Sequence, residues 1–209
     1  MNPAPLSGLT ILDLSRVLAG PYCTMMLADL GARVLKIEPP GDVDTTRGLA
    51  PQLGHGMSSY FTSVNRNKLG LTLDLKQPKG VAALRALAAK ADVVVENFRP
   101  DVMTRLGLGY PVLAGINPRI VYCGISGFGQ TGPDAEKPAY DQIIQGLSGA
   151  MDVNGDERLH PLRAGFPVCD TVGGLNAAFA ILAALYHREK TGEGQVIDVA
   201  LLDSIMPLM

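Results

Sequence analysis

The chain has no tryptophan, and its three cysteines, Cys23, Cys123 and Cys169, show no CxxC spacing. This odd and sparse set excludes a disulfide framework, argues against a structural zinc site and predicts a cytoplasmic protein with reduced thiols. A net charge of only −2 gives no field that would recruit nucleic acid or an anionic membrane. Charged residues interrupt each apolar run before about 18 residues, so we expect no transmembrane helix. Residues 1–5 lack the pattern of a signal peptide.

What is present is the composition of a globular protein. Apolar residues make up 47% of the 209 positions and charged residues 18%, with 24 glycines and 15 prolines. These proportions exclude a disordered chain, a collagen and a coiled coil. The length allows one domain with a real core or at most two.

Strand-like and helix-like periodicities alternate along the chain. We predict strands over residues 9–14, 33–38, 69–75, 92–96, 120–125 and 195–200. We predict helices over residues 20–30, 78–89, 100–106, 111–116, 140–151 and 171–190, with another beginning at 201. Residues 40–62 have many turn formers and predict a long surface loop, of a length that usually serves a function. The alternation predicts an α/β fold, with a mostly parallel sheet covered by helices on both faces.

Residues 127–132 match the GxGxxG pattern of dinucleotide sites. That fingerprint requires the glycines to open a helix whose first turn meets the pyrophosphate. Pro133 and Pro138 fall where this helix would run, and the run does not follow the first strand. We therefore interpret it as a flexible glycine loop.

Other common catalytic patterns are absent. His55, His160 and His187 are too widely spaced to form a metal-ligand pair, so we predict no metal site. Ser126 and the other serines lack the GxSxG frame of a hydrolase nucleophile.

Asp170 precedes the longest predicted helix and has two interpretations. The simpler one is an N-cap, whose carboxylate accepts a hydrogen bond from the first turn. The other is a functional carboxylate, held ionised by the helix dipole beside backbone donors that stabilise an oxyanion. Gly173 and Gly174 would let an acyl group approach the start of the helix closely. Spacing alone favours the cap.

Several segments, in order along nearly the whole chain, resemble the family III CoA-transferases, the group of formyl-CoA transferase and carnitine CoA-transferase. They are 19–21, 30–32, 34–38, Asp44, 47–48, 65–68, 73–76, Asp92, 97–100, 105–107, 191–195 and 198–200.

The resemblance implies that the ligand is coenzyme A and that certain positions line its site. Lys76, Arg99 and Arg105 are suited to phosphates, and Leu73, Leu75 and Phe98 to the adenine. Taken alone, each would be interpreted as an ordinary surface or core residue. The implied positions are Leu18, Ala19, Leu73, Asp74, Leu75, Lys76, Asn97, Phe98, Arg99, Arg105, Tyr140 and Asp141. Leu18 departs from the family, which often has a polar side chain there.

By the same resemblance Asp170 is the nucleophile. In the family this aspartate attacks the acyl-CoA thioester, and the anhydride that forms is converted into an aspartyl-CoA thioester that the acceptor carboxylate resolves. The α-methylacyl-CoA racemases share the fold but use a histidine where this chain has Tyr140. Tyrosine is a poor base at neutral pH, so we favour the transferase. A racemase-like epimerase and a truncated CoA-binding fragment without turnover are the alternatives.

Members of this family continue for about as long again, through a small domain and a return to the large domain. The resemblance therefore implies that residues 1–209 are the N-terminal portion of a Rossmann-like, CoA-binding large domain, truncated before the small domain and the C-terminal return. It also implies acyl-CoA and small carboxylic acids as partners and an interlocked homodimer. Arg163 is a candidate to hold the second carboxylate of a dicarboxylic acid, with an exposed surface arginine as the alternative.

Overall fold

Six parallel strands form the centre of the computed structural model, which describes residues 3–41 and 43–209. Met1 and Asn2, part of the segment tested above for a signal peptide, lie outside these ranges. The strand order is β5-β2-β1-β6-β7-β8. The strands are β1 (Thr10–Asp13), β2 (Arg33–Glu38), β5 (Lys68–Thr72), β6 (Val93–Glu96), β7 (Val121–Ser126) and β8 (Val196–Ala200). The predicted α/β class with a parallel sheet is confirmed.

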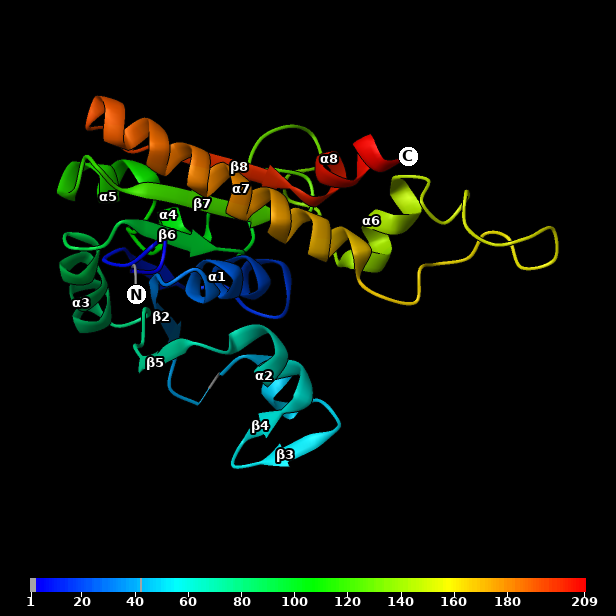
Figure 1. The fold of residues 1–209 in the computed structure, drawn as a ribbon, viewed down its shortest axis with the longest axis horizontal. Coiled ribbons are helices and arrows are strands. Elements are labelled where there is room, and N and C mark those ends of the chain that lie inside the picture. Colours follow the sequence, from blue (N-terminus) through cyan, green and yellow to red (C-terminus); the bar gives the residue numbers. More distant parts are fainter. Residues whose placement is uncertain (1–2, 42) are drawn as a thin grey trace.

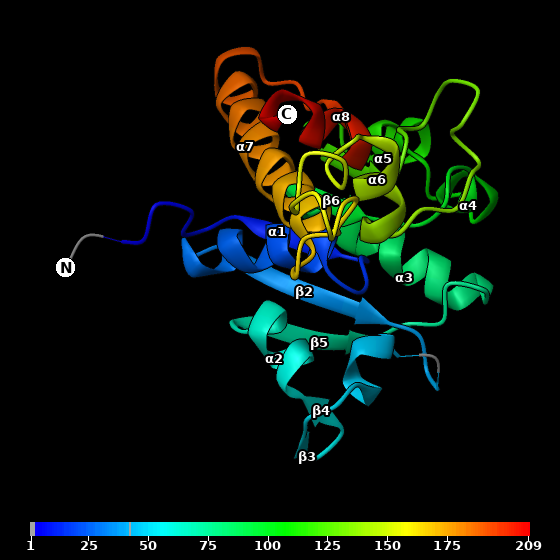
Figure 2. The same ribbon diagram turned by 90° about the vertical axis from the view of Figure 1, so that its right-hand side faces the viewer.

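Helices cover both faces of this sheet, as Figures 1 and 2 show. One face packs against α1 (Ala19–Asp29), α6 (Asp141–Leu147), α7 (Val168–Thr191) and α8 (Leu201–Ile205). The other face packs against α3 (Pro78–Ala88), α4 (Val102–Arg105) and α5 (Tyr110–Ile116). Alternation along β6 serves both cores, because Val93 and Val95 face the first set and Val94 faces the second.

The strand order reverses between β1 and β6. From β1 the chain moves to β2 and β5 on one side, then crosses to β6, β7 and β8 on the other. In doubly wound sheets, a ligand crevice opens at such a point, beyond the carboxyl ends of the strands. The loops that follow β1 and β6 therefore form the two sides of a candidate site.

The predicted loop over residues 40–62 is wrong in part. It contains the 3₁₀ turn η1 (Thr45–Gly48) and an antiparallel hairpin of β3 (Gln52–Gly54) and β4 (Met57–Ser58). Helix α2 (Ser59–Asn65) follows, and the Ser58 hydroxyl caps it by accepting from the Phe61 N–H at 3.0 Å. Such short strands carry too little periodicity to be recognised from the sequence. The hairpin and α2 project beyond the β5 edge of the sheet (Figure 1).

Two predicted boundaries also require correction. The strand predicted over 69–75 ends at Thr72, so Leu73 and Leu75 lie in the loop before α3. Helix α6 ends at Leu147, and an irregular segment that leads to α7 extends away from the body (Figure 1).

Helix α7 bears on the expectation that no segment spans a membrane, which stays a prediction. Its 24 residues are long and apolar enough to cross a membrane by length and composition alone. In this structure the helix packs on the sheet, and its Ala177, Ile181 and Ala184 are buried in the core. That packing is typical of a central helix in an α/β domain.

Candidate active site

A cleft of about 250 Å³ opens at the carboxyl ends of β1, β6 and β7. Asp170, from the first turn of α7, lies in its wall. The cleft also brings together half of the twelve positions that the family resemblance predicted to line the CoA site: Leu18, Ala19, Asn97, Phe98, Arg99 and Tyr140.

Asp170 is not the N-cap of its helix. Helix α7 begins at Val168 with Pro167 in the cap position, and the capping carboxylate comes from Asp141 at the start of α6. One oxygen of Asp141 accepts from the backbone N–H groups of Cys169 at 2.8 Å and Asp170 at 3.1 Å. A cap supplied by another helix leaves no local sequence signal. The prediction therefore assigned the role to the wrong aspartate.

Because Asp141 provides the cap, the side chain of Asp170 is left for other contacts. Burial, and after it the negative charge of Asp141, raises the pKa of the Asp170 carboxyl to about 7. The expectation that the helix dipole holds Asp170 ionised is therefore wrong. Because only the ionised carboxylate can act as a nucleophile, the raised pKa lowers the share of Asp170 that can attack near neutral pH.

Asp141 itself lies outside the cleft. Its side chain is only 4% exposed, and its second oxygen accepts a hydrogen bond from the Gln145 amide. The same Gln145 accepts from the backbone N–H of Ala164 at 2.8 Å. Asp141 thus links α6, the segment before α7 and α7 itself, and both its oxygens have partners within the chain.

The glycines at the start of α7 serve helix packing, not the approach of an acyl group. A Cβ on Gly173 would lie 2.3 Å from the side chain of Leu201, and one on Gly174 would lie 2.6 Å from the carbonyl oxygen of Ala19. Other parts of the chain therefore fill the space beside both glycines. Their effect on the site is indirect, because Gly174 lets the start of α1 pack close against α7.

The remaining predicted positions lie in two surface grooves away from Asp170. Leu75, Lys76 and Arg105 line one groove of about 520 Å³, beside α3 and α4. Leu73 and Asp74 line a second, at the start of α3. The structure therefore divides the predicted residues between the cleft and the α3 side of the sheet.

Sequence reasoning missed several residues of the cleft. Ser126 ends β7 in the cleft wall, and its buried hydroxyl has no hydrogen-bond partner among the described residues. Arg16, Val17 and Lys137 also line the cleft. The available signal was topological, because Ser126 ends one strand and Arg16 follows another at the carboxyl edge of the sheet.

Leu18 also lines a second cavity, of about 670 Å³. Tyr60, Phe166 and Arg163 contribute to its lining. Burial, followed by the negative charges of Asp170, Asp44 and Asp141, raises the pKa of Tyr60 to about 12. The negative charge of Asp170 therefore influences Tyr60, which lines this cavity.

The run over residues 127–132 is a loop, as interpreted from its prolines. Gly129 and Gly132 adopt φ values of +84° and +97°, and the next helix, α6, starts only at Asp141. No group of three metal-ligating side chains occurs within 3–41 and 43–209.

Residues 6–209 match the family model described as CoA-transferase family III. The chain belongs to CoA-transferase family III. The match covers the cleft and both grooves. The family resemblance stated from the motifs is therefore confirmed.

Similar proteins carry names that agree with this family. The chain is 46% identical to a succinate–glutarate CoA-transferase from Agrobacterium fabrum, over 95% of this chain and 51% of that protein. It is 47% identical to the human succinyl-CoA:glutarate CoA-transferase, over 97% and 46%. It is 48% identical to an acetyl-CoA:oxalate CoA-transferase from Acetobacter aceti, over 98% and 53%. The chain thus spans about half the length of the curated relatives it matches.

A solved structure shows the same fold. A CAIB/BAIF family protein from Brucella suis superposes with a TM-score of 0.95 at 42% identity, over 99% of this chain and 56% of that one.

Proposed function

We propose that this chain provides the acyl-CoA site and the nucleophile of an enzyme that transfers coenzyme A between small carboxylic acids. The observation that carries the proposal is the position of Asp170. It lies in the wall of a cleft at the point where the strand order reverses, with its own helix capped by another residue. Relatives of similar sequence are named as CoA-transferases.

Asp170 acts as the covalent group in this proposal. Its ionised oxygen attacks the thioester carbonyl carbon, the carbon–sulfur bond breaks, and the CoA thiolate leaves a mixed anhydride on the aspartate. The thiolate then attacks the aspartyl carbonyl, which gives aspartyl-CoA and releases the donor acid. The acceptor carboxylate reverses the sequence and leaves as the new thioester, with Asp170 regenerated.

The cleft and the grooves suggest how acyl-CoA binds. The thioester end enters the cleft, where the unpartnered hydroxyl of Ser126 can donate to a substrate oxygen. The phosphate-bearing end extends toward Lys76 and Arg105. Only an elongated ligand contacts both regions, and acyl-CoA has that shape.

We propose dicarboxylic acids as the substrates that exchange CoA. The names of the relatives contain succinate, glutarate and oxalate. The larger cavity beside Leu18 has the exposed Arg163 in its lining, together with the apolar side chains of Met25 and Phe166. An arginine there can take the far carboxylate while the near one reacts.

A racemase is the less favoured alternative. It requires a base on each side of the α-carbon, and Tyr140 stands where racemases have a histidine. Its side chain is 71% exposed at the rim of the cleft.

We also propose a cytoplasmic homodimer with neither a membrane nor a nucleic-acid partner. Three buried free thiols, those of Cys23, Cys123 and Cys169, suit a reducing compartment. Leu175, Phe179 and Tyr186 expose a stripe of apolar surface along α7, which suits burial against further protein.

Peptide mass spectrometry after incubation with acyl-CoA thioesters tests the proposed function. We expect a CoA or acyl adduct on the peptide that contains Asp170, and none in Asp170→Ala. Asp203→Ala is the matched control, because Asp203 is also an aspartate in the first turn of a helix, α8, but is exposed. An adduct that survives in Asp170→Ala would exclude Asp170 as the nucleophile. Loss of the substrate α-proton to solvent without any adduct would favour the racemase.

A further inference from the structure

The loop between β1 and α1 forms one side of the cleft and has an unusual backbone. Val17 adopts a φ of +68°, in the left-handed region that a β-branched residue rarely occupies. Its neighbours Arg16, Leu18 and Ala19 all line the cleft with Asp170. Such a conformation persists only where the surrounding contacts hold it.

Asn97 holds one end of this loop. Its side-chain amide accepts from the Arg16 N–H at 2.8 Å and donates to the Arg16 carbonyl at 2.8 Å. These two bonds fix the residue before Val17 from the β6 side of the cleft. Asn97 was predicted as a CoA-lining residue, and its amide is already engaged in shaping that lining.

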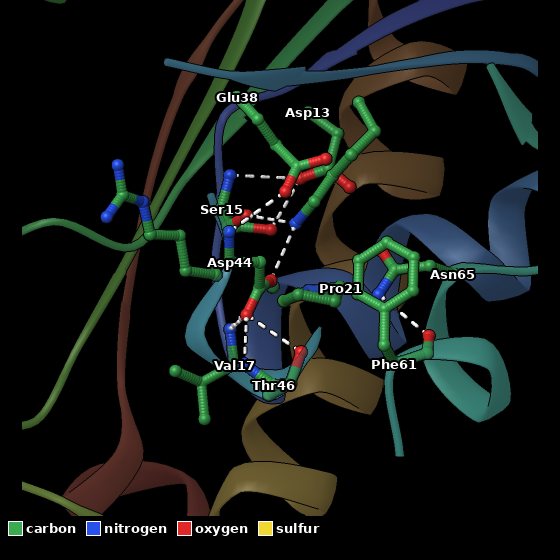
Figure 3. Close-up of polar contacts among 12 residues, drawn as sticks. Asp13, Ser15, Val17, Pro21, Glu38, Asp44, Thr46, Phe61 and Asn65 are labelled. Carbon is green, nitrogen blue, oxygen red and sulfur yellow. Dashed lines mark hydrogen bonds and ion pairs between the residues drawn. The ribbon is translucent and has the colours of Figure 1, made fainter. Parts of the chain in front are cut away.

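Asp44 holds the other end from the β2 side. The Val17 N–H lies 3.3 and 3.2 Å from its two carboxylate oxygens. One oxygen also accepts from the backbone N–H and the hydroxyl of Thr46, at 3.1 and 2.8 Å. The Asp44 side chain is completely buried, and Figure 3 shows dashed contacts from it to both Val17 and Thr46.

A buried lysine balances the charge of Asp44. The Lys36 ammonium, 2% exposed, lies 3.0 Å from the second Asp44 oxygen and also donates to the carbonyl of Ser15. Lys36 therefore joins Asp44 to the loop at a point two residues before Val17. The network continues on both sides. Glu38 accepts from the Asp44 N–H, and Asp13, paired with Lys68, accepts from the Ser15 N–H (Figure 3).

We propose that Asp44 is a positioning residue of the acyl-CoA site, which keeps Val17 in the left-handed conformation and so sets the surface of residues 16–19 that faces Asp170. This inference rests on the proposed function of the cleft. A buried ion pair is weak evidence for stability, because desolvation offsets the attraction. The Asp44–Lys36 pair instead fixes the conformation of the loop, because both residues form hydrogen bonds with its backbone.

Rescue by glycine separates positioning from stability. We expect Asp44→Asn to weaken CoA binding about tenfold. The neutral amide of the asparagine no longer forms an ion pair with Lys36, and Val17 can then leave its left-handed conformation. Val17→Gly in the same chain should recover most of that loss, since glycine adopts a positive φ without steric cost. The melting temperature should stay low in the double variant, because Lys36 is still buried without its partner charge.

Asp92→Asn is the matched control. Asp92 also pairs with a buried cation, Arg188 at 3.0 Å, but it precedes β6 and so lies at the opposite edge of the sheet from the cleft. This variant should lower the melting temperature and leave the CoA dissociation constant unchanged. If Asp44→Asn does not fold, Lys36→Met with Asp44→Asn leaves no unpaired charge, and the same rescue by Val17→Gly is expected.

Calorimetric titration of coenzyme A into the full-length protein measures the loss of CoA affinity in Asp44→Asn and its recovery by Val17→Gly. Unchanged CoA affinity in the folded Asp44 variant would overturn this inference alone. So would a loss that Val17→Gly leaves uncorrected. Absence of CoA binding by the unaltered protein would overturn the proposed function, and this inference with it.

Discussion

The carboxylate of Asp141 accepts a hydrogen bond from the backbone N–H of Asp170, so one buried acid caps the helix that carries a second, partly buried acid. This contact has two opposed effects. It satisfies N–H groups at the start of α7 that no residue of that segment serves. It also places a negative charge beside the carboxyl that we propose as the nucleophile, and raises its pKa further than burial alone.

The first prediction concerns the pH dependence of adduct formation. Since only the ionised form of Asp170 attacks, the initial rate should rise with pH and reach half its maximum near pH 7. Asp141→Asn keeps a carbonyl oxygen for the cap and removes the charge. Its midpoint should lie below that of the unaltered protein, but above the ordinary aspartate range, because burial, the larger cause, remains. Rapid-quench mass spectrometry between pH 5 and 9 gives both midpoints.

An identical midpoint in the two proteins would show that Asp141 does not influence Asp170 through charge. Asp152→Asn is the control, because Asp152 is exposed in the segment between α6 and α7. It should leave the midpoint unchanged.

The second prediction is that Asp170→Asn stabilises the protein at neutral pH. The folded-state pKa of about 7 lies above the ordinary value of 3.8, so the folded protein binds this proton more tightly than the unfolded chain. The stability that Asp170 contributes therefore falls as pH rises from about 4 to 7. Differential scanning calorimetry should find the variant more stable by a few degrees at pH 8, roughly the effect of 1 kcal/mol in a chain of this size. At pH 4 the difference should vanish. A variant less stable than the parent at pH 8 would contradict the raised pKa.

The order and type of the main strands and helices could be predicted from the sequence, because the signals for them are local and recur along the chain. β2 has the predicted bounds of Arg33–Glu38, and α3 begins at the predicted Pro78. Each strand buried on both faces reads as an apolar run, and each helix shows its own period. The hairpin of β3 and β4 was missed because two strands of three and two residues carry no measurable period.

The site was less predictable because its decisive contacts join distant segments. Asp141 caps a helix that begins 27 residues later, and Asp44 supports Val17 from 27 residues away. Neither relationship leaves a spacing that a sequence pattern can detect. The family resemblance marked Asp141 as part of the site, and the structure shows that its carboxylate contacts backbone N–H groups instead of the cleft.

The third prediction concerns the close packing of α1 on α7. A Cβ on Gly174 would lie 2.6 Å from the carbonyl oxygen of Ala19, which is backbone and cannot move aside on its own. Gly174→Ala should therefore destabilise the protein by about 1–3 kcal/mol, and CoA should bind more weakly because Ala19 lines the cleft. Gly115→Ala is the control. Gly115 lies within α5 with open space around it, so alanine should stabilise by about 0.5–1 kcal/mol. Urea unfolding measures both, and equal stability of the two variants would refute the packing argument.

The fourth prediction concerns the acceptor acid. If Arg163 holds the far carboxylate of a dicarboxylic acid, Arg163→Ala should raise the KM for succinate or glutarate about tenfold, as expected for a lost charge-assisted hydrogen bond. The KM for a monocarboxylic acid of the same length should not change, nor should the KM for acyl-CoA. Arg163→Lys should recover part of the affinity, since lysine keeps the charge but not the planar fork. Arg158→Ala is the matched control, because Arg158 is exposed in the same segment but does not line the cavity. An equal rise in KM for both kinds of acid would mean that Arg163 shapes the cavity without recognising the second carboxylate.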